Sequence, residues 1–226
     1  MGVFELPKGL LHELNKLIKG YWWGQINQER KINWISWNQM GKSKIGGGLG
    51  FRDFENFNIA LLAKQGLRLL QNPNSLAAQV LQLKYFPYSD FFNAKLGSSP
   101  SFLWRSLLVV RPLLQEGAIW RIGNGNSVRI WTDKWLPTPS TFKPQSGFQF
   151  FDREAKVNLL INHQTREWNI NVIKEIFSKE DADTIVQIPL SHYTRSDQLI
   201  WRCTKNGMFN VKSAYYLQGD ILNSRQ

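Results

Sequence analysis

The stretch from Trp120 to Pro137 reads WRIGNGNSVRIWTDKWLP, and its residue types come close to those of a phosphate-binding site. The backbone N–H groups of a glycine-rich loop such as GNGNS can cradle a phosphate when a strand leads into the loop and a helix leaves it. Here the residues after the loop alternate like a strand, and Pro137 opposes an early helix. The pattern therefore favours the tight turn of a β-hairpin, in which Trp120 and Ile122 precede the turn and Val128 and Ile130 follow it.

Carboxylates suited to two-metal catalysis are the second chemistry to consider. Polymerases and nucleases hold two metal ions ~3.5–4 Å apart with several carboxylates. The densest acidic group in this sequence is Glu180, Asp181 and Asp183. This group follows Ser178, and the spacing predicts a capping box and an acidic first turn of a helix. We therefore interpret these carboxylates as the start of a helix and not as metal ligands.

The ligands and motifs of other enzyme classes are scattered or absent from the sequence. Zinc sites need clustered Cys and His side chains, whereas the candidates here have no paired spacing: His12, His163, His192 and Cys203. The sequence contains no Walker loop and no nucleophile elbow. From the residues alone we predict no catalytic residue, no metal ligand and no cofactor.

Positive charge gathers in the first two thirds of the chain. The formal net charge is +11, to which residues 1–70 contribute +5, residues 71–150 +5 and residues 151–226 only +1. A basic surface attracts nucleic acid through its phosphates. We therefore predict that RNA or DNA binds a basic surface within residues 1–150, with these contacts: Lys42, Lys44, Arg52, Lys64, Arg68, Arg121, Arg129 and Lys134. A solvated, lysine-rich surface without a specific partner explains the same charge and stays open as an alternative.

Helices must position most of these cations. Apolar residues recur at helical spacing over 7–23, 54–71 and 101–117. Asp53 and Ser101 are the expected N-caps of the second and third of these helices. A kink is expected at Pro112, because proline has no N–H for the helical hydrogen bond.

A further, shorter helix is predicted over 75–85, between the second and third of the helices above. Its apolar residues are spaced at about one helical turn, so we expect Leu76, Val80 and Leu83 to face inward, with Ala77 as a further candidate.

Two hairpins are predicted in the second half of the chain. One is built around GNGNS, and the other surrounds the Asn-Gly turn at 206–207, which precedes a helix that begins near 211. We therefore predict an α+β fold that is predominantly α-helical, with two small antiparallel β-hairpins. The expected parts are a helical domain over 1–117, a Trp-rich β-hairpin over 118–136, a Pro-containing linker or loop over 137–150, and a small α+β segment over 151–226.

Several motifs occur together in a characteristic order: YWWG, KINWISWNQM, GGGLGFRDFENFNIALLAKQ, WRIGNGNSVRIWTDKWLP and NGMFNVKSAYYL. This combination resembles the polyprotein of plant non-LTR (LINE-type) retrotransposons over essentially the whole chain. The similar region of that polyprotein runs from the thumb of the reverse transcriptase to the beginning of its zinc-binding segment. The helical domain over 1–117 would correspond to the thumb or the connection. Free-standing plant proteins that resemble this region are known, and some are named for reverse transcriptase or ribonuclease H.

The resemblance implies a protein without polymerase or ribonuclease H activity. The catalytic aspartates of the family lie in the palm, upstream of the part that resembles Met1. Its zinc ligands follow the part that resembles VKSAYYL, and its ribonuclease H carboxylates lie further on. We therefore expect a catalytically inactive fragment of a LINE-type reverse transcriptase that can still bind nucleic acid. The alternative is a free-standing, basic RNA- or DNA-binding protein derived from such an element.

Signals for a cellular compartment are weak in this sequence. Cys203 is the only cysteine, so no disulfide can form within the chain, and this favours an intracellular protein. No apolar run approaches the ~18–20 residues that span a bilayer, so we expect no contact with a membrane. The sequence does not distinguish the nucleus from the mitochondrion, and it indicates no protein partner.

Overall fold

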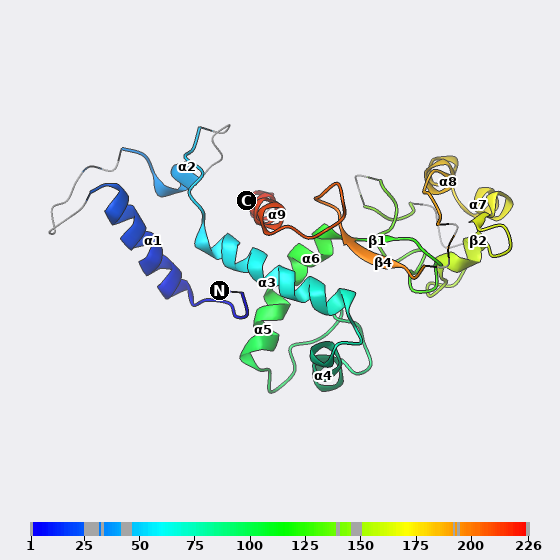
Figure 1. The fold of residues 1–226 in the computed structure, drawn as a ribbon, viewed down its shortest axis with the longest axis horizontal. Coiled ribbons are helices and arrows are strands. Elements are labelled where there is room, and N and C mark those ends of the chain that lie inside the picture. The colour runs from blue at the N-terminus through cyan, green and yellow to red at the C-terminus, as the bar shows by residue number, and fades with distance from the viewer. Residues whose placement is uncertain are drawn as a thin grey trace. The chain divides into compact units, whose positions relative to one another are not determined.

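The computed structural model describes the chain except for residues 1, 25–31, 33, 42–46, 139–140, 146–150, 192, 194 and 225–226 and the side chain of residue 38. The chain forms two compact units. Unit 1 comprises Met1–Glu116 and Phe209–Gln226, and unit 2 comprises Gly117–Met208. Helices are the main regular elements among the described residues, together with two small antiparallel two-stranded sheets (Figure 1). The predicted fold class is therefore confirmed.

Unit 1 is built from helices around a central one. In chain order they are α1 (Lys8–Trp22), α2 (Trp37–Gly41), α3 (Phe54–Gln71), α4 (Leu76–Tyr85), α5 (Phe102–Val109), α6 (Arg111–Gly117, whose last residue begins unit 2) and α9 (Val211–Asn223). Helix α3 packs against α9, α5, α1 and α4 and buries Leu62, Ala63 and Leu67. Its predicted cap is confirmed, because the Asp53 side chain accepts a hydrogen bond from the Asn56 N–H at 2.8 Å. Figure 1 shows α3 with α5 and α9 on its two sides.

Helix α9 brings the end of the chain back onto unit 1. Ala214 and Leu217 are buried, and α9 packs along α3. The Tyr215 hydroxyl accepts a hydrogen bond from the Asp53 backbone N–H at 3.0 Å, just before α3 begins. Unit 2 is thus inserted between two segments of the chain that belong to unit 1.

The predicted helix over 101–117 is two helices, α5 and α6, with a break at Val110. Ser101 is the N-cap as predicted, and its side chain accepts from the Trp104 N–H at 3.2 Å. Pro112 lies in the first turn of α6, where a helix does not need the missing N–H. The chain therefore ends one helix and starts another instead of kinking.

The predicted inward face of α4 is wrong. Leu76, Val80 and Leu83 are 77%, 52% and 75% exposed, whereas Ala78 is buried. The reason is the aromatic ring at the end of the helix, because Tyr85 stacks on the buried Trp104 with 4.7 Å between ring centroids. Large rings bury more area than aliphatic side chains, so they decide which side of a ten-residue helix faces the core.

A leucine pair in unit 1 tests this orientation of α4. Leu83→Ala is expected to change the free energy of unfolding by less than about 0.5 kcal/mol, because the side chain is exposed. Leu67→Ala on α3 removes a buried side chain and is expected to cost about 2–5 kcal/mol. Urea denaturation measures both values, and a loss at Leu83 as large as that at Leu67 would contradict the described face.

Unit 2 contains both sheets. Strand β1 (Ala118–Arg121) pairs antiparallel with β4 (Gln198–Trp201), and β2 (Ile161–Asn162) pairs with β3 (Glu167–Trp168). The remaining elements are the 3₁₀ helix η2 (Val157–Leu160), α7 (Ile170–Ile176) and α8 (Lys179–Val186). Ser178 caps α8 as predicted, because its side chain accepts from the Asp181 N–H at 3.3 Å. Asp181 is itself buried, and its carboxylate accepts from the Gln145 N–H at 2.8 Å.

The predicted strand partners in unit 2 are wrong. Residues 120–122 do not pair with 128–130; instead the Ile130 N–H donates to the Ala155 carbonyl and the Val157 N–H donates to the Val128 carbonyl, both at 2.9 Å. After β4 a turn places the Gly207 carbonyl 2.8 Å from the Trp201 N–H, but no strand follows it among the described residues. The prediction pairs each of these two segments with a neighbour in the sequence. In the structure β1 and β4 pair with each other, although they lie about 80 positions apart.

Tryptophans form much of the core of unit 2. Trp131, Trp135 and Trp168 are buried together with Val128 and Ile130. The indole N–H of Trp135 donates to the Ile130 carbonyl at 2.9 Å, and that of Trp168 donates to a carbonyl at 2.8 Å. These rings therefore serve packing.

Candidate nucleic-acid interface

The GNGNS loop binds an anion, but the anion belongs to the chain itself. The N–H groups of Gly123 and Gly125 donate to Oδ1 of Asp197 at 2.8 and 2.9 Å. The N–H of Ser127 donates to Oδ2 of the same carboxylate at 2.8 Å. Asp197 is only 9% exposed. Successive backbone N–H groups that converge in this way form an anion-binding nest.

The rest of the loop is held by Asn158, which lies in η2. The Asn158 N–H donates to the Gly125 carbonyl at 3.0 Å, and the Asn158 side chain donates to Oδ1 of Asn126 at 2.9 Å. The loop is therefore neither the turn of a hairpin nor an open phosphate site. Its N–H groups are occupied by an aspartate that follows about 70 positions later in the sequence.

The predicted cations of unit 1 lie in solvent where the structure describes them. Lys42 and Lys44 fall outside the described residues. Arg52 is exposed, and its guanidinium carbon lies 4.9 Å from the centroid of the Phe57 ring. Lys64 and Arg68 are exposed one turn apart on α3, on the side that faces away from its buried residues. These last two side chains can contact phosphates together.

Of the three predicted cations of unit 2, Arg121 is exposed, and Arg129 and Lys134 are partly buried. Arg129 is held by carboxylates: its backbone N–H donates to Asp133 at 2.7 Å, and its guanidinium lies 3.4 Å from Asp133 and 3.6 Å from Glu154. The Lys134 ammonium lies 5.6 Å from the centroid of the Phe142 ring. Arg121 is exposed on β1. The Arg129 charge is thus offset by acidic neighbours, and only Arg121 of the three is an exposed side chain.

Sequence reasoning missed further cations of unit 1. Residues 56–115, which run from α3 into α6, contain six Lys or Arg and a single acidic residue, Asp90. Besides the two on α3 these cations are Lys84, Lys95, Arg105 and Arg111. All are exposed except Arg111, whose pKa is lowered by burial and whose guanidinium donates to the Ala94 carbonyl at 2.6 Å. The scarcity of acidic residues over this range is the sequence signal that would have found them.

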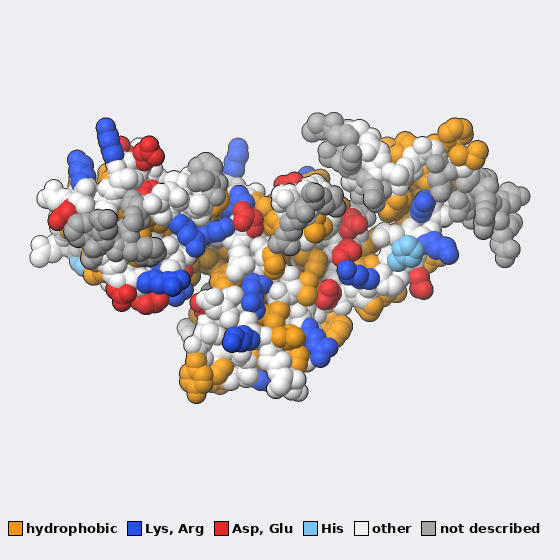
Figure 2. Space-filling view, turned by 180° about the vertical axis from the view of Figure 1, so that it is seen from behind, with side chains coloured by type: hydrophobic (Ala, Val, Ile, Leu, Met, Phe, Trp, Pro, Cys, Tyr) orange, Lys and Arg blue, Asp and Glu red, His pale blue; other side chains and the backbone are white. Residues whose placement is uncertain are grey.

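We call the five exposed cations of this range the α3–α5 basic surface: Lys64, Arg68, Lys84, Lys95 and Arg105. Figure 2 shows Lys and Arg side chains spread over the lobe that carries α4 and α5, with apolar side chains between them. Exposed lysine and arginine next to exposed apolar groups are suited to a polyanion with flat, apolar bases.

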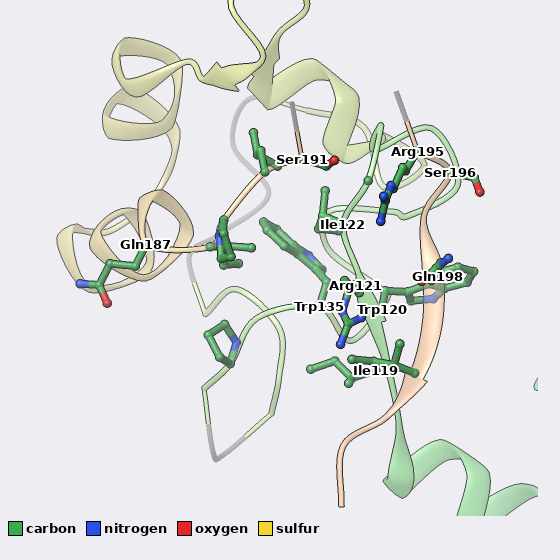
Figure 3. Close-up of a pocket in the computed structure, with 16 residues that line it drawn as sticks. Ile119, Trp120, Arg121, Ile122, Trp135, Gln187, Ser191, Arg195, Ser196 and Gln198 are labelled. Carbon is green, nitrogen blue, oxygen red and sulfur yellow. The ribbon is translucent and has the colours of Figure 1, made fainter. Parts of the chain in front are cut away.

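A pocket of about 590 Å³ lies in unit 2 (Figure 3). The strand register places Ile119 beside Ile200 and Arg121 beside Gln198, so these four side chains share one face of the β1–β4 sheet. That face lines the pocket, and Trp120, which shares the other face with Leu199, belongs to the lining as well.

Two kinds of feature are absent from the described part of the chain. No three side chains of His, Cys, Asp or Glu gather there closely enough to hold a metal ion. None of the helices there combines the length and the apolar character that crossing a membrane requires.

Comparisons with known proteins found two relatives from Arabidopsis thaliana. The "Uncharacterized mitochondrial protein AtMg00310" is 39% identical over 145 residues, which cover 64% of this chain and 94% of that protein. The "Putative ribonuclease H protein At1g65750" is 30% identical over 221 residues, which cover 95% of this chain but only 35% of that protein. No family model matches the chain, and no solved structure matches it.

Proposed function

This chain belongs to the family of the uncharacterized mitochondrial protein AtMg00310, and from this premise we propose that it is a retrotransposon-derived segment that binds RNA or DNA without catalysis. In detail, the chain corresponds to the region between the thumb and the zinc-binding segment of a LINE-type reverse transcriptase. The ordered motifs that resemble such polyproteins support this origin. So does the similarity of nearly the whole chain to a third of a protein named for ribonuclease H.

The proposed binding of nucleic acid rests on the α3–α5 basic surface. Five exposed cations face solvent over a range that contains one acidic residue. That residue, Asp90, accepts hydrogen bonds from the backbone and side chain of Asn93 at 2.8–3.1 Å. Lysine and arginine contact phosphates without reading the sequence of bases, so we propose binding that depends on charge and not on sequence.

A free-standing binding protein derived from such an element is the second candidate. The specific observation that favours it is the size of the AtMg00310 relative, which 145 residues of this chain cover almost completely. A protein of this family therefore exists at about the length of the part that is shared. Both candidates place the nucleic acid on the same basic surface.

Neutralising three cations of the α3–α5 basic surface tests the binding function. Lys64→Gln with Arg68→Gln and Arg105→Gln is expected to weaken binding of a single-stranded RNA roughly tenfold to a hundredfold at ~50 mM salt. The slope of log affinity against log salt should become shallower by about 2, at about 0.7 for each lost phosphate contact. Fluorescence anisotropy at several salt concentrations measures both quantities.

The control removes the same charge from unit 2. Lys174, Lys179 and Lys205 are exposed there, and their replacement by Gln should change the affinity less than threefold, roughly what a general loss of charge causes. Equal losses from both triple variants would show that the basic surface is not the binding site. Failure of the unchanged protein to bind single strands or duplex at ~50 mM salt would refute the binding function. Extension of a primed RNA template with Mg²⁺ and deoxynucleotides would refute the absence of catalysis.

A further inference from the structure

The pocket in unit 2 has apolar walls and a rigid floor. Ile119 and Ile200 line it from the β1–β4 sheet, and Ile188 and Leu190 line it from the segment after α8. Trp135 closes it, and its indole N–H is tied to a backbone carbonyl, so the ring is held in place. Figure 3 shows the Trp135 ring in the middle of the lining side chains. A volume of about 590 Å³ is typical of sites for small organic groups.

The charged groups that line this pocket are all positive. Arg121 from β1 and Arg195 from the segment before β4 belong to the lining, and both side chains are exposed. The described lining residues include no Asp or Glu. The nearest carboxylate in the sequence, Asp197, is occupied by the three N–H groups of the GNGNS loop and does not line the pocket. The pocket is therefore complementary to an anion that carries an apolar group.

Polar groups with both donors and acceptors complete the lining. The Gln198 side chain shares the face of Arg121, and Ser191 and Ser196 lie on the segment that leads into β4. The Gln198 amide can donate to and accept from the edge of a heterocycle, and the Ser191 hydroxyl, whose oxygen accepts from the Tyr193 N–H at 3.2 Å, can donate to it. The Ser196 hydroxyl points away from the cavity (Figure 3). A nucleotide combines this kind of edge with an apolar, flat body and a phosphate.

From these features we propose that the pocket holds one unpaired nucleotide of a single-stranded nucleic acid. The base lies between the aliphatic walls, and the flanking phosphates contact Arg121 and Arg195. This proposal rests on the proposed nucleic-acid binding and adds a preference to it. Bases in a duplex are stacked and paired, so only a single strand can place a base in the pocket. The α3–α5 basic surface alone gives no such preference, because it contacts phosphates.

Two kinds of variant separate the base contact from the phosphate contacts. Arg121→Gln with Arg195→Gln is expected to weaken binding of a single-stranded RNA of about 12 nucleotides about tenfold and to make the salt slope shallower by about 1.4. Ile119→Trp fills the pocket, so it is expected to weaken the same binding about tenfold while the salt slope stays unchanged. Neither variant should change the affinity for a duplex of the same length by more than about twofold.

Controls address charge and folding. Lys174→Gln with Lys179→Gln removes the same charge away from the pocket, and Ile119→Val keeps the pocket open; both should bind like the unchanged protein. Thermal unfolding of Ile119→Trp shows whether unit 2 still folds, and the arginine pair tests the pocket without altering its core. Unchanged single-strand affinity in the arginine pair, while the triple variant of the α3–α5 basic surface loses affinity, would overturn the pocket and leave the proposed function intact. No binding of any nucleic acid would overturn both.

Discussion

Replacing Asp197 with alanine is expected to lower the free energy of unfolding of unit 2 by about 3–5 kcal/mol. The carboxylate accepts three backbone hydrogen bonds at 2.8–2.9 Å and is almost fully buried. Alanine leaves these N–H groups without an acceptor, and Gly123 and Gly125 are buried, so water does not replace the carboxylate easily. Hydrogen exchange of the unit 2 amides under increasing urea measures the loss separately from unit 1.

Asparagine at the same position separates shape from charge. Asp197→Asn keeps one carbonyl oxygen for Gly123 and Gly125 but turns an NH₂ donor toward the N–H of Ser127. We expect a loss of about 1.5–3 kcal/mol, smaller than that of alanine. The matched control is Asp183→Asn, an exposed carboxylate on α8, which should change stability by less than about 0.5 kcal/mol. Similar losses at positions 183 and 197 would contradict the role of the GNGNS loop as an anion cradle.

Features that depend on near neighbours in the chain could be predicted from the sequence. The caps Asp53, Ser101 and Ser178 lie three residues before the N–H groups that they accept from. Each cap and the start of its helix can therefore be recognised in the same short stretch of sequence. The bounds of α3 agree with the prediction for the same reason. The predicted class, mostly helical with a small amount of strand, follows from these local signals.

Features that depend on distant partners could not be predicted. GNGNS has the composition of an anion-binding loop, but the carboxylate that it binds follows about 70 positions later. Nothing in the sequence around a single aspartate indicates that it binds such a loop. Residues 128–130 are a nearby candidate partner for strand β1. The strand pairs instead with β4, because unit 2 begins at β1 and ends shortly after β4, where the chain returns to unit 1. The exposed Leu76, Val80 and Leu83 follow from the stack of Tyr85 on Trp104, which joins residues from two helices.

In the candidate site, too, contacts between near neighbours could be predicted and contacts between distant residues could not. Lys64 and Arg68 are exposed, because both fall on the polar side of a helix whose apolar face is clear, and their contact with nucleic acid stays a prediction. Arg129 looks equally suited in the sequence but is paired with Asp133 and Glu154, one of which comes from a segment about 25 positions away. The pocket could not be found at all, since its walls come from β1, β4 and the segment after α8.

Gly125→Ala is expected to have an effect as large as the loss of Asp197, for a steric reason. Gly125 has φ +73°, and a Cβ at this position would lie 2.8 Å from both the Asn158 Cα and the Val157 carbonyl carbon. These atoms are backbone, and the Asn158 N–H is bonded to the Gly125 carbonyl, so they cannot retreat without breaking that bond. We expect a loss of about 3–5 kcal/mol in the stability of unit 2.

Gly97→Ala supplies the matched control for the backbone conformation alone. Gly97 has φ +78°, close to that of Gly125, but nothing lies within 4 Å of the position of its Cβ. Its replacement should therefore cost unit 1 only about 1–2 kcal/mol, the strain of a left-handed alanine. The difference between the two variants measures the contact of the loop with the backbone of η2. Equal losses by hydrogen exchange in the two units would mean that conformation alone makes glycine necessary in GNGNS, and the close packing of this loop would then be wrong.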